Sequence, residues 1–159
     1  MGEGKWVTDT IIAHNFNIIQ QGINKTKYNV IFVDPSVVQI LKKSDKNTVK
    51  DTIENFKMDE KEYIFLPVNN HNKLGEEGGS HWSLLVYSKE YRGFFHHDPI
   101  DRANYKHAAE LMCNITAVND KFCTRLTDIC SPKQYNGYDC GLYIIMYARK
   151  MADNIAKGI

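Results

Sequence analysis

Long apolar runs are missing from this sequence of 159 residues. A helix needs about 20 consecutive apolar residues to cross a bilayer, and no stretch of this chain approaches that length. The first ten residues, MGEGKWVTDT, also lack the apolar core of a secretion signal. Trp6 occupies the position where a myristoylation motif requires serine or threonine. We therefore expect a protein of the cytoplasm or nucleus that does not bind membranes.

Cysteine is scarce, and its spacing does not suit a metal site. The four cysteines are Cys113, Cys123, Cys130 and Cys140, and no two of them form a C-x-x-C pair. Such pairs are the usual mark of a structural zinc site, so we expect no metal. An even number of cysteines is compatible with disulfides, but a chain without a secretion signal favours reduced thiols.

An excess of one charge is also absent. The chain has 20 Lys and Arg against 19 Asp and Glu, which gives a net charge of +1. Lys42, Lys43 and Lys46 are interrupted by Ser44 and Asp45, which is typical of a solvated face. Nucleic-acid binding and attachment to anionic membranes both require a concentrated basic surface. We therefore expect neither a nucleic acid nor a membrane among the partners.

What the chain does contain suits one folded domain. Its 43% hydrophobic and 25% charged residues are ordinary for a globular protein, and we expect one domain over residues 1–159 and a monomer. Apolar spacing and turn-forming residues predict helices at 7–21, 35–41, 47–57, 102–118 and 140–155, and strands at 29–33, 62–68, 82–88, 92–97 and 121–127. Helices before and after a block of strands indicate an α+β fold with a central, mostly antiparallel sheet. Thr8 or Asp9 is the expected cap of the first helix, and Asn47 that of the third.

A histidine and an aspartate stand at the ends of two neighbouring predicted strands. His81 directly precedes the strand at 82–88, and Asp98 directly follows the strand at 92–97. If these strands pair as an antiparallel hairpin, the start of one lies beside the end of the other. A carboxylate at that position would fix the tautomer and orientation of the imidazole.

A polar loop delivers a cysteine to the start of the last predicted helix. The string is QYNGYDCG, from Gln134 to Gly141, with the cysteine at Cys140. A helix N-terminus carries partial positive charge, which favours a thiolate there. Gly141 leaves room for a substrate carbonyl, while the amide of Gln134 and the backbone N–H of Cys140 could donate to a tetrahedral oxyanion.

The order His–Asp–Gln–Cys, the His-Trp pair and the string QxNxxDCG resemble the ubiquitin-like-protein-specific (sentrin-specific) cysteine proteases. The resemblance spans residues 6–155, and the segments GGSHWSLLVYS, FFHHD and QYNGYDCGLYII are most similar to the small deneddylating branch, which acts on the Nedd-eight modifier. It implies a papain-like fold in which the catalytic residues follow a permuted order along the chain. The catalytic set would be His81, Asp98, Gln134 and Cys140, without a cofactor.

The resemblance also implies residues that contact the substrate. WVTD, which begins at Trp6, is similar to the WLND segment of the family, where that tryptophan and the one after the catalytic histidine enclose a Gly-Gly tail. Trp6 and Trp82 would then form a tunnel that excludes larger side chains. Asp9 would contact the tail. Thr8 stands where the family has asparagine.

Each of these residues also has a purely structural interpretation. Cys140 could be an inert buried cysteine, as most free cysteines are. His96 and His97 are alternative bases beside Asp98, but alternation along a strand places them on opposite faces, so we expect one in the core and one exposed. For Asp139, a helix cap is favoured over a catalytic role.

The sequence therefore predicts a thiol protease that cleaves after the C-terminal Gly-Gly of a ubiquitin-like modifier, in precursors and in conjugates. Three alternatives remain open. The same chemistry could act on SUMO or ubiquitin, and a catalytically silent module could merely bind such a tail. The third alternative is an unrelated peptidase of the same clan that cuts ordinary polypeptides.

Overall fold

The computed structural model describes residues 8–72, 74, 81–136 and 139–159. Within these residues no helix is long and apolar enough to span a membrane. The elements follow one another as α1 (Asp9–Ile23), β1 (Val30–Phe32), α2 (Pro35–Lys43), α3 (Lys46–Asn55), the 3₁₀ turn η1 (Met58–Glu60), β2 (Tyr63–Asn69), β3 (Trp82–Ser88), β4 (Gly93–His97), α4 (Tyr105–Val118), β5 (Leu126–Ile129) and α5 (Cys140–Ala156).

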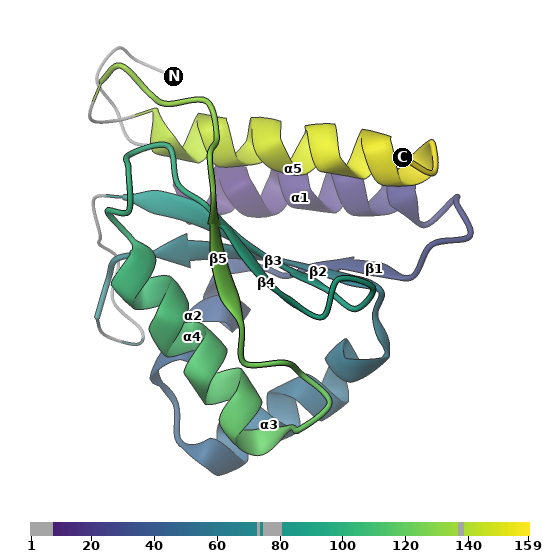
Figure 1. Cartoon of the computed structure of the whole chain (residues 1–159), viewed down its shortest axis with the longest axis vertical. Coiled ribbons are helices and arrows are strands. Elements are labelled where there is room, and N and C mark those ends of the chain that lie inside the picture. Colours follow the sequence, from purple (N-terminus) through teal and green to yellow (C-terminus); the bar gives the residue numbers. More distant parts are fainter. Residues whose placement is uncertain (1–7, 73, 75–80, 137–138) are drawn as a thin grey trace.

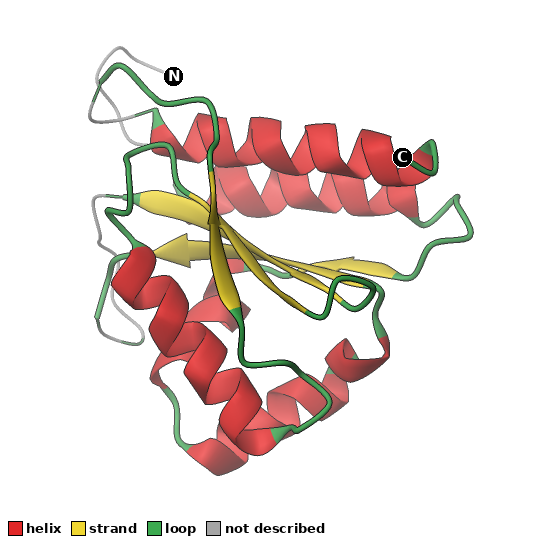
Figure 2. Cartoon of the chain, viewed as in Figure 1, coloured by secondary structure: helices red, strands yellow, loops and turns green. Residues whose placement is uncertain are grey.

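A five-stranded sheet in the order β1-β2-β3-β4-β5 forms the centre of the molecule. The inner pairs β2–β3 and β3–β4 are antiparallel, while the outer pairs β1–β2 and β4–β5 are parallel. Helices α1 and α5 cover one face of this sheet, and α2, α3 and α4 cover the other (Figures 1 and 2). The predicted α+β class is therefore confirmed, with parallel pairing added at both edges.

The sheet separates two apolar cores, because the side chains of a strand point alternately to its two faces. On the side of α1 and α5, Phe16, Phe32 and Phe65 form a line of aromatic contacts, with ring centroids 5.6 and 4.3 Å apart. On the side of α2, α3 and α4, Leu85 and Phe94 pack among the apolar residues of these helices. Burying one such large side chain contributes about 2–3 kcal/mol, so both helical layers are held firmly to the sheet.

Local capping agrees with one predicted helix start and corrects another. Thr8 caps α1, with its hydroxyl accepting from the backbone N–H of Ile11 at 3.4 Å. Helix α3 begins earlier than expected, because Asp45 rather than Asn47 accepts the N–H of Thr48, at 2.8 Å. A carboxylate is favoured at this position by the partial positive charge of the helix start.

The last strand was misplaced by the sequence pattern. Its predicted range was 121–127, but β5 covers Leu126–Ile129 and pairs parallel to β4. The stretch before it is a turn, in which the side chain of Asn119 accepts the N–H of Lys121 at 3.0 Å. Phe122 is buried in the core beside α4, so its apolar character reflects burial from a loop.

Candidate functional site

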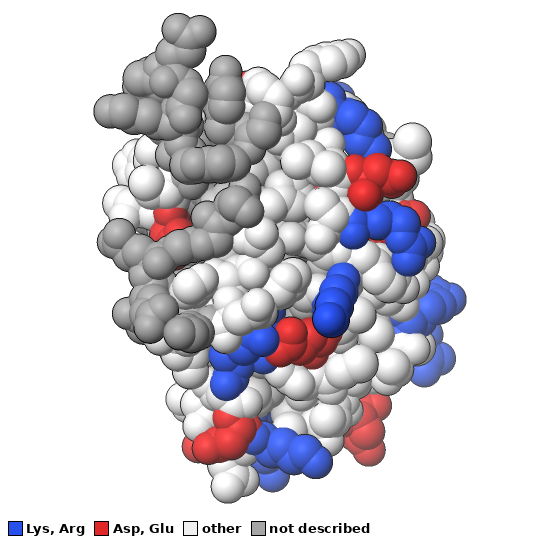
Figure 3. Space-filling view, turned by 90° about the vertical axis from the view of Figure 1, so that its left-hand side faces the viewer, with Lys and Arg blue, Asp and Glu red and all other residues white. Residues whose placement is uncertain are grey.

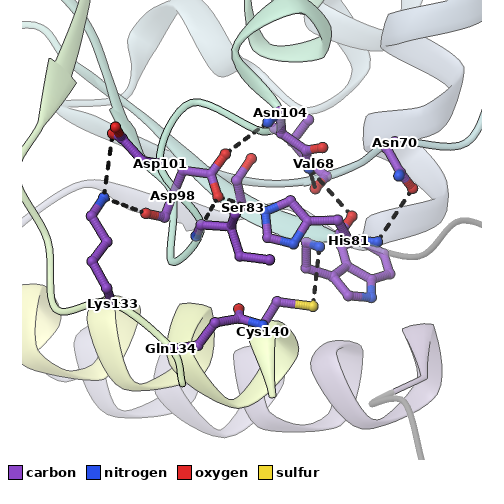
Figure 4. A network of polar contacts seen from close by, with 12 residues as sticks. Val68, Asn70, His81, Ser83, Asp98, Asp101, Asn104, Lys133, Gln134 and Cys140 are labelled. Atoms are coloured by element: carbon purple, nitrogen blue, oxygen red, sulfur yellow. Dashed lines mark hydrogen bonds and ion pairs between the residues drawn. The ribbon is translucent and has the colours of Figure 1, made fainter. Parts of the chain in front are cut away.

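His81 and Asp98 meet at one end of the sheet, as the hairpin pairing predicts. Nε2 of His81 lies 2.5 Å from Oδ1 of Asp98, and the two residues are only 5% and 3% exposed (Figure 4). The hairpin places them there, because β3 begins just after His81 and β4 ends just before Asp98. Asp98 is therefore positioned to fix which ring nitrogen of His81 faces away from it.

Backbone N–H groups hold the carboxylate of Asp98 in place. Its Oδ1 also accepts the N–H of Ile100 at 3.0 Å, and its Oδ2 accepts the N–H of Asn104 at 2.7 Å. Burial by itself would raise the pKa of Asp98, but hydrogen bonds from His81 and these two N–H groups lower it below its usual value. Asp98 is thus a stable carboxylate that faces the imidazole.

The environment of His81 favours its charged form. Burial opposes this, but hydrogen bonding to Asp98 and to the thiol of Cys140, together with their charges, raises the pKa of His81 from 6.5 to about 9. With Nε2 committed to Asp98, Nδ1 is the nitrogen left for Cys140. Nδ1 has no partner of ordinary hydrogen-bond geometry among the described residues, so its contact with the thiol is not a well-aligned bond.

Cys140 is the first residue of α5, as predicted, and its side chain points toward the end of the sheet (Figure 4). It is 1% exposed, and its Sγ accepts the backbone N–H of Trp82 at 3.3 Å. This donor joins the nucleophile candidate to the residue directly after His81. Both the peptide N–H and the helix N-terminus place partial positive charge near the sulfur.

The loop before α5 docks against the segment that follows Asp98. The backbone N–H of Gln134 donates to the carbonyl of Pro99 at 3.0 Å, and Nζ of Lys133 donates to the carbonyl of Asp98 at 2.9 Å. The amide nitrogen of Gln134 donates to the carbonyl of Asn136, while its Oε1 is buried without a partner among the described residues. Gln134 is thus brought to the site, and its predicted oxyanion contact stays a prediction.

Asp139 occupies the N-cap position of α5, but its side chain does not cap the helix. Its carboxylate accepts the amide of Asn136 at 2.7 Å, and its backbone N–H donates to Oδ1 of the same asparagine at 2.9 Å. The predicted cap position is therefore confirmed, with the backbone carbonyl of Asp139 accepting the N–H of Tyr143 at 3.1 Å in place of a side-chain bond. The carboxylate stabilises the loop that precedes Cys140 rather than the first turn of the helix.

His96 and His97 lie on opposite faces of β4, as alternation predicts, but neither is fully exposed. His96 is completely buried and bridges Ser83 at 2.8 Å and Asp128 at 3.0 Å. His97 is half-buried, accepts or donates at Nδ1 to the hydroxyl of Ser131 at 3.1 Å, and has its pKa lowered to about 4 by burial and by the nearby His96. The expectation that one of the two is exposed was wrong, because α5 and the loop before it cover that face.

The four residues expected to contact the substrate differ in where the structure places them. Trp6 lies outside the described residues. Trp82 is 5% exposed and packs in the core under α5, and Gly141 is buried as the second residue of that helix. Asp9 is exposed as the first residue of α1. The structure therefore brings Trp82 and Gly141 to the cysteine, while the roles of all four stay predictions.

Sequence reasoning did not identify two asparagines that hydrogen-bond to the backbone of His81, nor a buried lysine at the end of β2. Asn104 donates its amide to the carbonyl of His81 at 3.3 Å, and Asn70 accepts the backbone N–H of His81 at 3.3 Å. Lys42 is 1% exposed, and its Nζ donates to the carbonyls of Asn69 at 2.5 Å and His71 at 2.7 Å. Only the place of Asn70 directly after β2 could have indicated such a contact from the sequence.

Metal ligands and a concentrated charge are not seen where the structure describes the chain. No group of three or more His, Cys, Asp or Glu side chains that could hold a metal occurs among the described residues. On the face shown in Figure 3, basic and acidic side chains are interspersed rather than gathered by sign. That distribution does not resemble the basic surface of a nucleic-acid-binding protein.

The chain is similar in sequence to a family of known proteases. The sequence pattern described as "Ulp1 protease family, C-terminal catalytic domain" matches residues 5–158. Human sentrin-specific protease 8 is 30% identical over 156 residues, which cover 96% of this chain and 73% of that protein. NEDD8-specific protease 1 of Arabidopsis thaliana is 36% identical over 118 residues, which cover 72% of this chain and 51% of that protein.

Solved structures share the fold at low sequence identity. The SUMO protease Ulp1 with its catalytic cysteine oxidized to a sulfinic acid superposes with a TM-score of 0.75 at 20% identity, covering 96% of this chain and 69% of that one. The Xanthomonas campestris effector XopD bound to ubiquitin gives a TM-score of 0.74 at 17% identity, with coverages of 99% and 80%. At these identities the likeness establishes the fold alone.

Proposed function

This chain belongs to the Ulp1 protease family, and we propose that it is a cysteine protease that cleaves after the C-terminal Gly-Gly of a ubiquitin-like modifier, NEDD8 above all. The substrate class is supported by its relatives, which include sentrin-specific protease 8 and NEDD8-specific proteases. The observation that carries the proposal is geometric. A thiol at the start of α5 lies against an imidazole that is held from behind by a buried carboxylate.

The first half of the reaction follows from the charges at this site. In the proposed resting state the proton of Cys140 resides on His81, whose pKa is raised to about 9. The thiolate attacks the carbonyl carbon of the modifier's last glycine and forms a C–S bond, while the carbonyl electrons move to the oxygen. The side-chain amide of Gln134 and the backbone N–H of Cys140 are the proposed donors to this oxyanion, and each such donor is typically worth about 3–4 kcal/mol of barrier.

In the second half the imidazolium acts as an acid and the imidazole then acts as a base. His81 gives its proton to the departing amine as the C–N bond breaks, which leaves a thioester between Cys140 and the modifier. Water then attacks the thioester and gives one proton to His81. The C–S bond breaks to release the thiolate and the modifier's carboxylic acid, which loses its proton to solvent. Asp98 keeps Nε2 as the proton-bearing nitrogen throughout, so that Nδ1 exchanges the proton.

The shape of the proposed tail site rests on Trp82 and Gly141. Trp82 is anchored in the core and adjoins the thiol through its backbone N–H, so its position is fixed relative to the nucleophile. Gly141, which has no side chain, is the proposed side from which the substrate carbonyl approaches the thiol. Trp6 and Asp9 are proposed to complete the contacts with the tail.

Covalent trapping tests the nucleophile and the substrate class together. The probe is NEDD8 with a thiol-reactive group in place of its C-terminal carboxylate, and we expect one adduct with the native protein. Cys140→Ala should give none. Cys113→Ala and Cys130→Ala are the matched controls, because both cysteines are exposed in the structure, and each variant should react as the native protein does. An adduct that survives Cys140→Ala would overturn the assignment.

Turnover of a panel of modifiers separates the remaining possibilities. NEDD8, SUMO and ubiquitin, each with a fluorogenic C-terminal amide, are compared with a short peptide amide at equal concentration. We expect the highest kcat/KM with NEDD8. Preferred cleavage of SUMO or ubiquitin would change the substrate but not the chemistry. Binding of a modifier without turnover, or cleavage of the peptide alone, would contradict the proposed activity.

A further inference from the structure

Asn104 contacts both members of the His81–Asp98 pair from a single buried position. It precedes α4 and is 0% exposed. Its backbone N–H donates to Oδ2 of Asp98 at 2.7 Å, and its side-chain amide donates to the carbonyls of Val68 at 3.0 Å and His81 at 3.3 Å (Figure 4). One residue therefore joins the end of β2, the start of β3 and the turn after β4.

The backbone of His81 depends on side-chain amides because it lies just outside the regular ladder of β3. Its N–H donates to Oδ1 of Asn70, and its carbonyl accepts from the N–H of Asn70 and from the amide of Asn104, all at 3.3 Å. These bonds are long, so no single one fixes the backbone. The amide of Asn104 approaches from α4, on the side opposite to the thiol carried by α5.

Stability alone does not account for an asparagine at this position. Oδ1 of Asn104 is buried and has no hydrogen-bond partner among the described residues, and an unmatched buried oxygen lowers the stability of the folded state. Features that cost stability persist at functional sites when another property compensates for them. Here the compensating contacts are the two hydrogen bonds that the side-chain amide of Asn104 donates to Val68 and His81, which link β2 to His81.

We propose that Asn104 is a positioning residue of the proposed protease reaction, which holds the imidazole of His81 at the correct distance from the thiol of Cys140. Its backbone N–H orients Asp98, and its side chain fixes the backbone from which the imidazole projects. A displacement of a reacting group by about 1 Å can cost about 100-fold in rate. The role rests on the proposed function, but the geometry it controls exists before any substrate binds.

The test compares two asparagines that lie on the same helix or at its start. Asn104→Ala removes the side-chain hydrogen bonds to the carbonyls of Val68 and His81. It keeps the hydrogen bond from the backbone N–H to Asp98. Asn114→Ala is the matched control, because the amide of Asn114 also donates to two carbonyls, of Leu41 at 3.2 Å and Lys42 at 2.7 Å, away from the site. Both variants should lower Tm, and Asn104→Ser replaces Asn104→Ala if the latter does not fold.

Two readouts distinguish positioning from a purely structural role. The first readout is turnover of the fluorogenic modifier amide that the native protein cleaves. Asn104→Ala should lower kcat by about 10–100-fold and change KM by less than about threefold, while Asn114→Ala keeps both constants. Without any modifier, the rate of Cys140 alkylation by iodoacetamide is followed from pH 5 to pH 10. The midpoint, the pH at which this rate is half of its maximum, should be higher in Asn104→Ala than in the native protein and unchanged in Asn114→Ala.

The alkylation arm keeps the two hypotheses separate. If the native protein cleaves no modifier but the midpoint still moves only in the Asn104 variant, the proposed function fails and the positioning role stands. The role is overturned if Asn104→Ala has a lower Tm but keeps the native kcat and the native pH profile of alkylation. It is equally overturned if both asparagine variants lose the same fraction of kcat when each is assayed the same number of degrees below its own Tm.

Discussion

Two histidine–carboxylate pairs at the β3, β4 and β5 strands behave in opposite ways, although both histidines are buried. His81 and Asp98 are 2.5 Å apart, and His96 and Asp128 are 3.0 Å apart. The pKa of His81 is raised to about 9, whereas burial lowers that of His96 below 6.5. A carboxylate beside a buried histidine is therefore not enough to keep the ring protonated.

The difference lies in what else faces each ring. Asp98 is 3% exposed and forms its ion pair with His81, whereas Asp128 is 27% exposed and pairs with Arg102 at 3.2 Å as well as with His96. A solvated carboxylate shared with another cation attracts an imidazolium less strongly. His81 also faces the thiol of Cys140, whose negative form stabilises the positive ring.

The second pair has the composition of a hydrolase triad without its function. Nε2 of His96 lies 2.8 Å from Oγ of Ser83, and its Nδ1 lies 3.0 Å from Asp128. Ser83 and His96 are both 0% exposed, so the triplet lies inside the fold, where β3, β4 and β5 meet. We interpret this triplet as a structural link between β3, β4 and β5. What separates the two pairs functionally is the thiol at a helix start beside His81.

Removing one carboxylate at a time should produce the largest contrast between the pairs. Asp98→Asn is expected to lower kcat/KM by about 10³–10⁴-fold, because the amide no longer selects the tautomer of His81 or stabilises its charge. Asp128→Asn should stay within about twofold to threefold, since it touches none of the proposed reacting groups. The measurement is turnover of the modifier amide by both purified variants. Comparable losses in the two would show that the pairs act as one unit.

The pH dependence of stability should carry opposite signs for the two histidines. The folded-state pKa of His81 lies above its ordinary 6.5, so its contribution is fully present below pH 6.5 and is lost as pH rises through about 9. That contribution is on the order of 3 kcal/mol for a shift of this size. The folded-state pKa of His96 is lowered, so its contribution is present above pH 6.5 and is lost as pH falls.

Urea denaturation at several pH values between 5 and 9.5 checks both signs. His81→Gln should flatten the decline of the unfolding free energy between pH 6.5 and 9, and His96→Gln should reduce the decline below pH 6.5. His97, whose pKa is lowered to about 4, retains an acid-side contribution in both variants. A native protein that gains stability from pH 7 to 9 would contradict the charged state assigned to His81.

The first pair was predictable from the sequence because its geometry follows from local rules. A hairpin between two aromatic-rich segments fixes which residues meet at its open end, so the pairing of His81 with Asp98 follows from strand order alone. Cys140 was predictable for a similar reason, since a loop of turn formers followed by an apolar helical pattern marks a helix start. Each inference needed only the chain on either side of the residue.

The second pair and the support for the first were not predictable in this way. His96 meets Asp128 because β5 joins the sheet parallel to β4, and the pattern placed that strand several residues too early. Asn104 and Lys42 reach carbonyls 36 and 27 positions away in sequence, at the end of β2. Contacts of this kind depend on how helices dock on the sheet, and apolar periodicity sets the buried face without fixing individual hydrogen bonds.

The smallest effect is expected at the exposed edge of the second pair. Arg102 is 60% exposed, pairs with Asp128 and lies over the ring of Tyr105 at 4.1 Å. Arg102→Gln should change the unfolding free energy by less than about 1 kcal/mol, because exposed ion pairs and exposed cation–π contacts contribute little. The measurement is urea denaturation at low and at high salt, with Arg102→Lys as the control that retains the charge.

Both replacements keep a side chain at a residue whose φ of 55° lies in the left-handed region, so any difference between them reflects charge and stacking rather than backbone preference. The small native advantage should shrink further in high salt, where exposed charges are screened. A loss above about 2 kcal/mol would place Arg102 among the groups that hold Asp128 against His96. The second pair would then be a buried network in its own right, and its contrast with His81 and Asp98 would rest on the nucleophile alone.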